Sequence, residues 1–336
     1  MPDISTIKAS DGDYTTLAAW ETAKDGLSPD DYIAECDSGF DLGSVTFSDW
    51  PFGSTATVRA ATGHENFGDF TAGAYITGGI TCIEPNLSVT IQDMRINKGG
   101  SGTAIARNGS GYQDSTILIN RCIITGGQFG VSLSGSYHAG PKVYIYNSII
   151  QGATDYGVYY DVVVGWATSE CRVWNCTIDG DGADYAVYAS GENSTGHVIS
   201  VKNSVGVRNT TDFYVSNSSN INENGGGYNA VEDFTGSIFG STGSLSSQAY
   251  ASMFEDVASD DYSLKTGSNL IEAGTDLSAT FTTDITGATR SGTWSIGAYA
   301  VVLYPEINLV GNGENISNGD TTPSEADYTD FGSVNV

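Results

Sequence analysis

The sequence predicts an all-β fold, a parallel β-helix in which short strands stack coil upon coil, and two repeated phrases carry the prediction. The first phrase places alternating apolar residues before a polar residue, a small residue and an isoleucine, as in Val143–Ile150. Its copies recur at spacings of 28, 26, 28 and 28 residues, marked by Asp93, Arg121, Asn147, Asn175 and Asn203. A period of this length indicates one supersecondary unit repeated along a solenoid.

The second phrase is an aromatic residue followed, two positions later, by a valine; the residue between them is Gly or Ala in three copies and Tyr214 in the fourth. Its copies start at Phe129, Tyr156, Tyr185 and Phe213, at spacings of 27, 29 and 28. The apolar residues alternate with period two, which is typical of strands, and the repeat is too short for a crossover helix. Equivalent residues of neighbouring coils are therefore expected about 4.8 Å apart, with Ile on Ile and Tyr on Tyr.

Residues 1–29 are predicted to close the first end of this solenoid. Leu17 and Trp20 follow helical spacing within a predicted helix over residues 15–24, and Thr15 or Thr16 supplies its N-cap. A short amphipathic helix at this place covers a strand edge and a core that would otherwise promote aggregation.

The first phrase resembles that of the right-handed, pectate-lyase-like β-helix family, in which an asparagine occupies a tight bend between strands. Asn147, Asn175 and Asn203 match that position, whereas Asp93 and Arg121 depart from it, so a three-rung asparagine ladder is expected. The resemblance implies a β-helix over residues 30–302, with roughly ten coils. Because the family hosts lyases, hydrolases, adhesins and virus spikes, it does not imply one function.

Three further segments resemble parts of surface proteins. Residues 9–21 resemble the start of β-helix proteins of bacteriophages and marine bacteria, and residues 261–274 with 294–299 resemble the closing coils of secreted β-helix proteins. Residues 305–313 and 330–334 resemble the first strands of an immunoglobulin-like domain. Residues 303–336 are therefore predicted to be an extended tail or a partial β-sandwich.

Two interpretations of this tail stay open. It is either the start of a truncated domain or a tail that lies along the last coil, or else it adds strands to a neighbouring subunit. In the second interpretation the assembly residues are Ile307, Leu309, Phe331 and Val334.

Charge and cysteine content restrict the partners. The chain carries 40 acidic and 13 basic residues, a net charge of −27, so nucleic acids and polyanionic glycans are expected to be repelled. Five cysteines without zinc-type spacing predict buried thiols, with Cys122 and Cys176 in one inward position two coils apart. The sequence shows no signal peptide and no apolar run that could span a membrane. We expect a virion or an extracellular surface as the location.

No catalytic residue is assigned. The basic residues do not form the set that a lyase needs, the clustered acids of a polygalacturonase-type hydrolase are missing, and the three histidines are interpreted as loop residues. A glycosidase needs only two carboxylates, so an unusual pair stays an alternative.

Two weaker sites are predicted. A glycan-binding surface is expected from the richest aromatic zone of the chain, which also includes Tyr185 and Tyr188. The residues assigned to the site are Tyr159, Tyr160, Trp166, Trp174 and Asp161. The carboxylates of Asp179, Asp181 and Asp184 lie around two glycines and could bind Ca²⁺, although a plain turn is the alternative and no other cofactor is expected.

The sequence thus favours a structural or adhesive protein: a phage tail spike, fibre or capsid appendage, or a surface filament subunit that self-associates as a trimer or filament. The alternatives are a polysaccharide-degrading lyase or glycoside hydrolase and a non-catalytic glycan-binding module.

Overall fold

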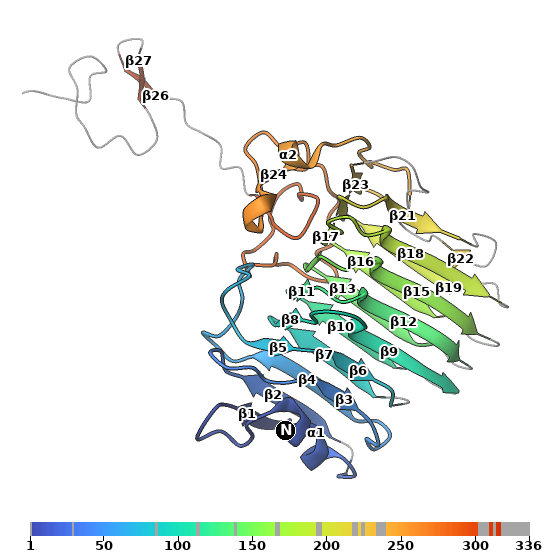
Figure 1. The fold of residues 1–336 in the computed structure, drawn as a ribbon. Coiled ribbons are helices and arrows are strands. Elements are labelled where there is room, and N and C mark those ends of the chain that lie inside the picture. Colours follow the sequence, from blue (N-terminus) through green and yellow to red (C-terminus); the bar gives the residue numbers. More distant parts are fainter. Residues whose placement is uncertain are drawn as a thin grey trace, which may run out of the picture. The chain divides into compact units, whose positions relative to one another are not determined.

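The computed structural model confirms an all-β parallel β-helix (Figure 1). It describes residues 2–28, 30–84, 87–111, 115–137, 140–164, 169–192, 197–216, 221–222, 226–232, 240–301, 309–311 and 314–316. The chain divides into two compact units, Met1–Val301 and Val302–Val336, and the first contains the solenoid.

Three parallel sheets form the solenoid, and each coil adds a strand to them in turn. Sheet I has nine strands: β1 (Asp3–Ile7), β2 (Asp31–Cys36), β4 (Thr55–Ala60), β7 (Ser88–Gln92), β10 (Thr116–Asn120), β13 (Lys142–Tyr146), β16 (Glu170–Trp174), β19 (His197–Lys202) and β22 (Ile221–Asn222). Sheet II has seven: β5 (Tyr75–Thr77), β8 (Arg95–Asn97), β11 (Ile123–Thr125), β14 (Ile149–Gln151), β17 (Thr177–Asp179), β20 (Val205–Val207) and β23 (Ala230–Val231). Sheet III also has seven: β3 (Val45–Phe47), β6 (Ile80–Cys82), β9 (Thr103–Gly111), β12 (Phe129–Tyr137), β15 (Tyr156–Val164), β18 (Tyr185–Glu192) and β21 (Thr211–Val215).

The first repeated phrase folds as a strand of sheet I, a bend and a strand of sheet II. Its apolar positions stack in register, as the sequence predicts: Ile119 pairs with Ile91 on one side and with Ile145 on the other. These side chains are fully buried in one core that runs through the solenoid. Apolar burial along every rung therefore fixes the register, because a slip by one residue would turn the apolar set outward.

The bend between sheets I and II takes the left-handed backbone conformation in five successive coils. The φ angles lie between 48° and 60° at Asp93, Arg121, Asn147, Asn175 and Asn203. The two non-asparagine copies therefore share the geometry of the bend, although they lack its amide. Asp93 and Arg121 instead pair with each other, Arg121 Nε lying 2.6 Å from Asp93 Oδ1.

The second phrase is in register only in its first three copies. Phe129 pairs with Tyr156 and Tyr156 with Tyr185, but Tyr185 pairs with Thr211. The expected start of the fourth copy was wrong by two residues, since Phe213 pairs with Val187 and points into the core. In this coil the first aromatic residue of the phrase therefore does not mark the outward position of the strand.

The first end of the solenoid carries the predicted helix, α1 (Leu17–Lys24). The Thr16 hydroxyl accepts a hydrogen bond from the Ala19 amide, which caps the helix, and Leu17 and Trp20 are fully buried. The first coil nevertheless begins inside the predicted cap, because β1 pairs in parallel with β2.

At its other end, the solenoid stops before the roughly ten coils that were expected. The last solenoid strand is β23, and residues 240–301, which we call the return segment, contribute no strand to the three sheets. The segment contains α2 (Tyr250–Met253), β24 (Phe254–Asp256), the 3₁₀ turn η1 (Val257–Ser259) and β25 (Asp261–Leu264), and β24 pairs antiparallel with β25.

The return segment packs back along the solenoid it has just left. Apolar residues of the segment, among them Phe254, Tyr262 and Ile285, cover the outward side chains of sheet II such as Ile149 and Val205. Its last residues reach the early loop 61–74, where the Tyr299 hydroxyl donates to the Gly68 carbonyl at 2.9 Å.

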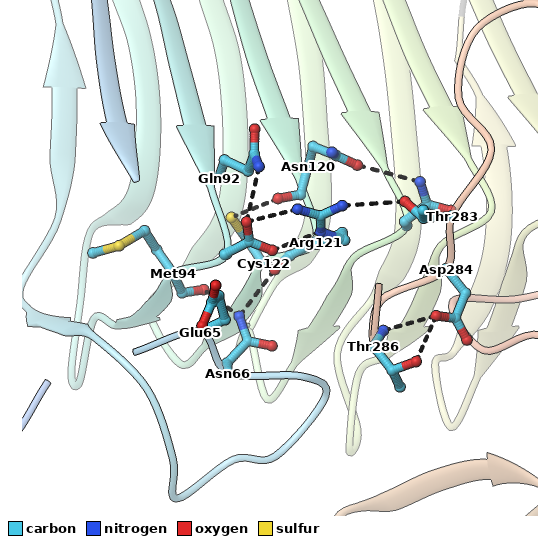
Figure 2. Close-up of polar contacts among 12 residues, drawn as sticks. Glu65, Asn66, Gln92, Met94, Asn120, Arg121, Cys122, Thr283, Asp284 and Thr286 are labelled. Carbon is cyan, nitrogen blue, oxygen red and sulfur yellow. Dashed lines mark hydrogen bonds and ion pairs between the residues drawn. The ribbon is translucent and has the colours of Figure 1, made fainter. Parts of the chain in front are cut away.

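Figure 2 shows one of these contacts, at the Arg121 bend. The Asn66 amide of the early loop donates to the Arg121 carbonyl at 2.9 Å. On the other side, the Arg121 guanidinium donates to the Thr283 hydroxyl of the return segment at 3.1 Å. One bend thus joins three segments that are far apart in the sequence.

All five cysteines are free and buried, as predicted. His197 was interpreted as a loop residue, and this was wrong: it begins β19, is fully buried, and its Nδ1 lies 2.9 Å from the Ser169 hydroxyl.

In the second unit, β26 (Leu309–Gly311) and β27 (Glu314–Ile316) pair antiparallel. Among the residues that the structure describes, no helix has the length and apolarity to span a membrane.

Candidate functional site

The most distinctive surface of the described chain is a group of six aromatic side chains on sheet III, which we call the aromatic surface. Its members lie on β12, β15, β18 and β21 and are all half-exposed: Phe129, Tyr156, Tyr159, Tyr185, Tyr188 and Tyr214.

The six rings form two adjoining columns along the solenoid. Phe129, Tyr156 and Tyr185 make the first column, with centroids 5.4 Å apart at both steps. Tyr159, Tyr188 and Tyr214 make the second, with steps of 5.6 and 5.9 Å. Rings also meet across the columns, with centroids 4.8 to 5.4 Å apart. The rings therefore form one continuous layer instead of scattered contacts.

Two successive buried positions at the corner of the coil explain why residues three apart share the outside. Strand residues normally alternate, so positions 156 and 159 should face opposite sides. At Gly157, however, an added Cβ would lie 2.4 Å from Ile178 Cγ2 and 2.7 Å from the Ala186 carbonyl oxygen. Gly157 and Val158 both face inward here, which turns Tyr156 and Tyr159 outward together.

Three tyrosines of this surface, Tyr156, Tyr159 and Tyr185, have a raised pKa. Burial among the neighbouring rings raises the pKa of Tyr156 and of Tyr185 above the ordinary value. The pKa of Tyr159 is raised further, first by burial and then by its hydrogen bond to Asp161, whose Oδ2 accepts from the hydroxyl at 2.8 Å. At neutral pH the surface therefore presents phenol groups that both donate and accept.

A hollow of about 440 Å³ lies at the turns that lead into β12 and β15, directly before Phe129 and Tyr156 in the chain. Its polar lining includes Gln128 and Asp155, joined by a hydrogen bond of 2.7 Å from Gln128 Nε2 to Asp155 Oδ2. Five glycine and serine residues complete much of the wall: Gly100, Ser101, Gly126, Gly127 and Gly152. Amide, hydroxyl and carboxylate groups thus adjoin the aromatic layer.

The structure separates the residues predicted for a glycan site. Tyr159 and Asp161 lie together on the aromatic surface. Tyr160 is fully buried, with its hydroxyl 2.6 Å from that of Ser169, so it faces the core and not the solvent. Trp174 lies on sheet I, and Trp166 lies outside the described residues.

Sequence reasoning missed Phe129, Tyr156 and Tyr214 as members of the aromatic surface. The second repeated phrase already contained a signal for two of them, because an aromatic residue at the same position of successive coils must stack. Tyr214 could not be found in this way, because the phrase put Phe213 in the aromatic column, whereas Tyr214 pairs with Tyr188 and stacks on its ring.

Sheet I carries a smaller aromatic group that holds basic residues. The Arg172 guanidinium lies 4.6 Å from the centroid of Tyr144 and 4.9 Å from that of Trp174, and its Nε lies 2.6 Å from Glu170 Oε1. Lys202 lies 5.2 Å from the Trp174 centroid. Residues of the return segment pack against this group, so Trp174 is only 9% exposed.

The three carboxylates predicted to bind Ca²⁺ do not gather around a common point. Asp179 is almost fully buried; it accepts from Arg208 at 2.6 Å and from the Tyr262 hydroxyl at 2.7 Å. Asp181 pairs with the same arginine, and Asp184 is exposed beside the aromatic surface. Nowhere in the described part of the chain do three His, Cys, Asp or Glu side chains form a group that could hold a metal ion. Asp179 and Asp181 act as partners of Arg208.

Most of the predicted assembly residues lie outside the part of the chain that the structure describes. Leu309 lies in β26, while Ile307, Phe331 and Val334 lie outside the described residues.

Comparison with known proteins adds no relative: no family model, no curated protein and no solved structure matches the chain. What defines the protein is therefore its architecture, a parallel β-helix with an aromatic surface on one sheet.

Proposed function

We propose that the protein is a structural and adhesive β-helix that binds a neutral glycan through the aromatic surface without cleaving it. The observation that carries this proposal is the continuous layer of six half-exposed rings on sheet III. A folded protein rarely leaves so many adjoining aromatic side chains open to solvent unless they bind something.

The chemistry of the surface favours a carbohydrate. Sugar rings have apolar C–H faces and hydroxyl edges, and tyrosine offers an apolar ring together with a hydroxyl that donates and accepts. Asp161, Asp155 and Gln128 add polar groups at the margin. The net charge of −27 favours a neutral glycan over a polyanionic one.

A binding role is preferred to catalysis because two of the carboxylates near these rings, Asp161 and Asp155, already have hydrogen-bond partners. The Asp161 carboxylate accepts from Tyr159, and that of Asp155 accepts from Gln128 and from the Thr154 hydroxyl. Arg121 and Arg172, two of the arginines considered for a lyase, are paired with Asp93 and Glu170. We therefore keep the lyase and hydrolase as alternatives without a residue that favours them.

The test is a screen of immobilised neutral and acidic glycans, followed by affinity measurements on any glycan that binds. Tyr159→Ala and Tyr188→Ala are each expected to weaken binding about fivefold, since one aromatic contact contributes about 1 kcal/mol. Tyr144→Ala is the matched control, a half-buried tyrosine on sheet I. Absence of glycan binding, or equal affinity in all three variants, would refute the proposal. Release of shorter products would instead support the enzyme alternatives.

At the level of biology, we propose a virion component, such as a tail spike, fibre or capsid appendage, or a surface filament subunit. Support comes from the resemblance of the N-terminal segment and from the stacked architecture, which suits a rigid spacer. Light scattering and electron microscopy of the intact chain test self-association. Trimers or filaments would support this part of the proposal, whereas a stable monomer would exclude the strand-donating tail.

A further inference from the structure

A second hollow, of about 340 Å³, lies on sheet II and does not involve the aromatic surface. Its floor is a grid of six side chains from β5, β8 and β11. One column contains Tyr75, Arg95 and Ile123, and the other contains Thr77, Asn97 and Thr125. The parallel register places each column in line along the solenoid.

Two segments that are distant in the sequence lie at the sides of this hollow. Phe70, from the early loop 61–74, lines the hollow, and its ring lies 5.8 Å from that of Tyr262 in the return segment. In the next coil, Gln151 donates to Asp260 at 2.6 Å, so the return segment covers the sheet from there on. The hollow is therefore the part of sheet II between the loop and the return segment.

Arg95 is the only cationic side chain among the lining residues, and part of its guanidinium has no strong partner. Nη1 donates to the Phe70 carbonyl at 2.5 Å, and the guanidinium carbon lies 5.1 Å from the Tyr75 centroid. In contrast, Nε is buried with no partner among the described residues, and Nη2 reaches only the Gly73 carbonyl at 3.5 Å.

On the Nε–Nη2 edge of this guanidinium, Nε has no partner among the described residues and Nη2 has only the long contact with Gly73. The shape of this edge favours one kind of ligand. Two parallel N–H groups on one edge of a guanidinium match the two oxygens of a carboxylate. Asp69 is an acidic group that acts on the Arg95 guanidinium, and its carboxylate already accepts from the Thr71 amide and hydroxyl. A buried donor without a partner is costly, so a ligand oxygen here would be stabilising.

The second column offers neutral hydrogen-bonding groups in the same hollow. Within the described chain, the side chains of Thr77, Asn97 and Thr125 make no hydrogen bond, although all three line the hollow. They are spaced one per coil, about 4.8 Å apart. A hydroxylated ligand of a few carbon atoms could contact two or three of them.

We propose that this hollow binds a small hydroxylated carboxylate, of the sugar-acid class. The carboxylate binds the Nε–Nη2 edge of Arg95, its hydroxyl groups bind the Thr77–Asn97–Thr125 column, and Phe70 and Tyr75 flank its carbon chain. Binding requires a small movement of the guanidinium, because Nε is not exposed in the unliganded hollow. The site is independent of the proposed glycan surface.

The experiment measures binding of D-gluconate to the full chain by calorimetry, with sorbitol and acetate as probes that each lack one part of the ligand. Saturable binding of gluconate is expected, at least about tenfold tighter than binding of either probe. Equal binding of sorbitol would overturn the carboxylate contact, and equal binding of acetate would overturn the polar column. No saturable binding of gluconate would overturn the whole proposal.

Variants locate the site. Arg95→Gln should lower gluconate affinity at least about tenfold, and Asn97→Ala about threefold. Asn97 is exposed and its side chain makes no hydrogen bond within the described chain, so its variant remains informative if Arg95→Gln disturbs loop 61–74. Arg59→Gln, at an exposed arginine of sheet I paired with Glu35, is the matched control. Unchanged affinity in Asn97→Ala, or an equal loss in Arg59→Gln, would overturn the assignment.

Tyr188→Ala should leave gluconate binding unchanged while weakening glycan binding, which separates this site from the aromatic surface.

Discussion

At the scale of single residues, the bend between sheets I and II shows what an asparagine contributes beyond its tolerance of positive φ. Asn175 has φ 53°, is fully buried, and accepts from the Asn203 amide at 3.2 Å. Its own amide reaches the Ser295 carbonyl of the return segment at 3.5 Å. The side chain thus links a neighbouring coil to the segment that covers it.

Replacing Asn175 tests both contributions. Asn175→Ala should lower the free energy of unfolding by about 2–4 kcal/mol, since alanine is strained at this φ and the partners lose their hydrogen bonds. Asn175→Gly should cost about half as much, because glycine adopts the conformation without strain. Urea unfolding measures both variants. Equal losses would show that the backbone conformation does not contribute.

The buried tyrosines give a pH dependence at the same scale. Burial raises the pKa of Tyr146 to about 12, and the pKa values of Tyr156 and Tyr185 are also raised by burial. An unfolded tyrosine ionises near pH 10, so above this pH the unfolded chain has lost protons that the folded chain keeps. Stability is therefore expected to fall as the pH rises from about 10 toward 12.

Absorbance of tyrosinate measures this effect directly. The native protein should titrate at higher pH than the same protein in concentrated urea, where tyrosines ionise near their ordinary pKa. Coincident titration curves in the two solvents would contradict the burial of these hydroxyls.

At the scale of elements, the return segment is attached to the solenoid by polar contacts as well as by its apolar side chains. Arg290 is 5% exposed, and its guanidinium donates to the carbonyls of Gly297 and Ala298 at 3.0 and 2.8 Å. It also reaches the Asn147 side chain of the bend at 3.4 Å. Backbone and side-chain acceptors of both segments depend on this one cation.

Arg290→Ala is expected to loosen the return segment locally. The cost should be about 3 kcal/mol, because buried carbonyls lose charge-assisted hydrogen bonds and a cavity remains. Hydrogen exchange should increase in residues 280–298 and much less in sheet III. A matched control is Lys265→Ala, an exposed residue of the same segment. Uniform acceleration over the whole solenoid would show that the segment and the coils unfold as one unit.

At the scale of the whole molecule, in-register strands and a single stacked core should make unfolding slow. The mostly non-local strand pairing predicts slow folding as well, because each rung joins residues about 27 positions apart. At the start of the solenoid α1 contacts β1, β2 and β3, and near its other end Leu245 of the return segment pairs with Ala230 of β23, which limits fraying at these two places.

A thermal scan at two heating rates tests this expectation. The midpoint should lie above about 60 °C, the upper part of the range of ordinary domains, and should rise with the heating rate if unfolding is kinetically controlled. A reversible midpoint below about 50 °C would contradict it.

The sequence by itself determined the stacked architecture, because the period, the alternation and the bend residues are local properties of each repeat. It predicted α1 and its cap, the rung-by-rung register of Ile91, Ile119 and Ile145, and the burial of the cysteines. It also placed Tyr159 and Asp161 in one aromatic zone.

Only the tertiary structure decided where the aromatic zone divides and where the solenoid ends. Tyr160 faces the core while Tyr159 faces outward, because two successive buried positions, Gly157 and Val158, reset the alternation of β15. Asp179 and Asp181 are occupied by Arg208, a partner 27 to 29 positions away whose reach no local pattern shows. Likewise, residues 240–301 cover sheet II instead of adding coils, since an apolar outward face such as Ile149 and Val205 is buried only when a distant segment returns to it.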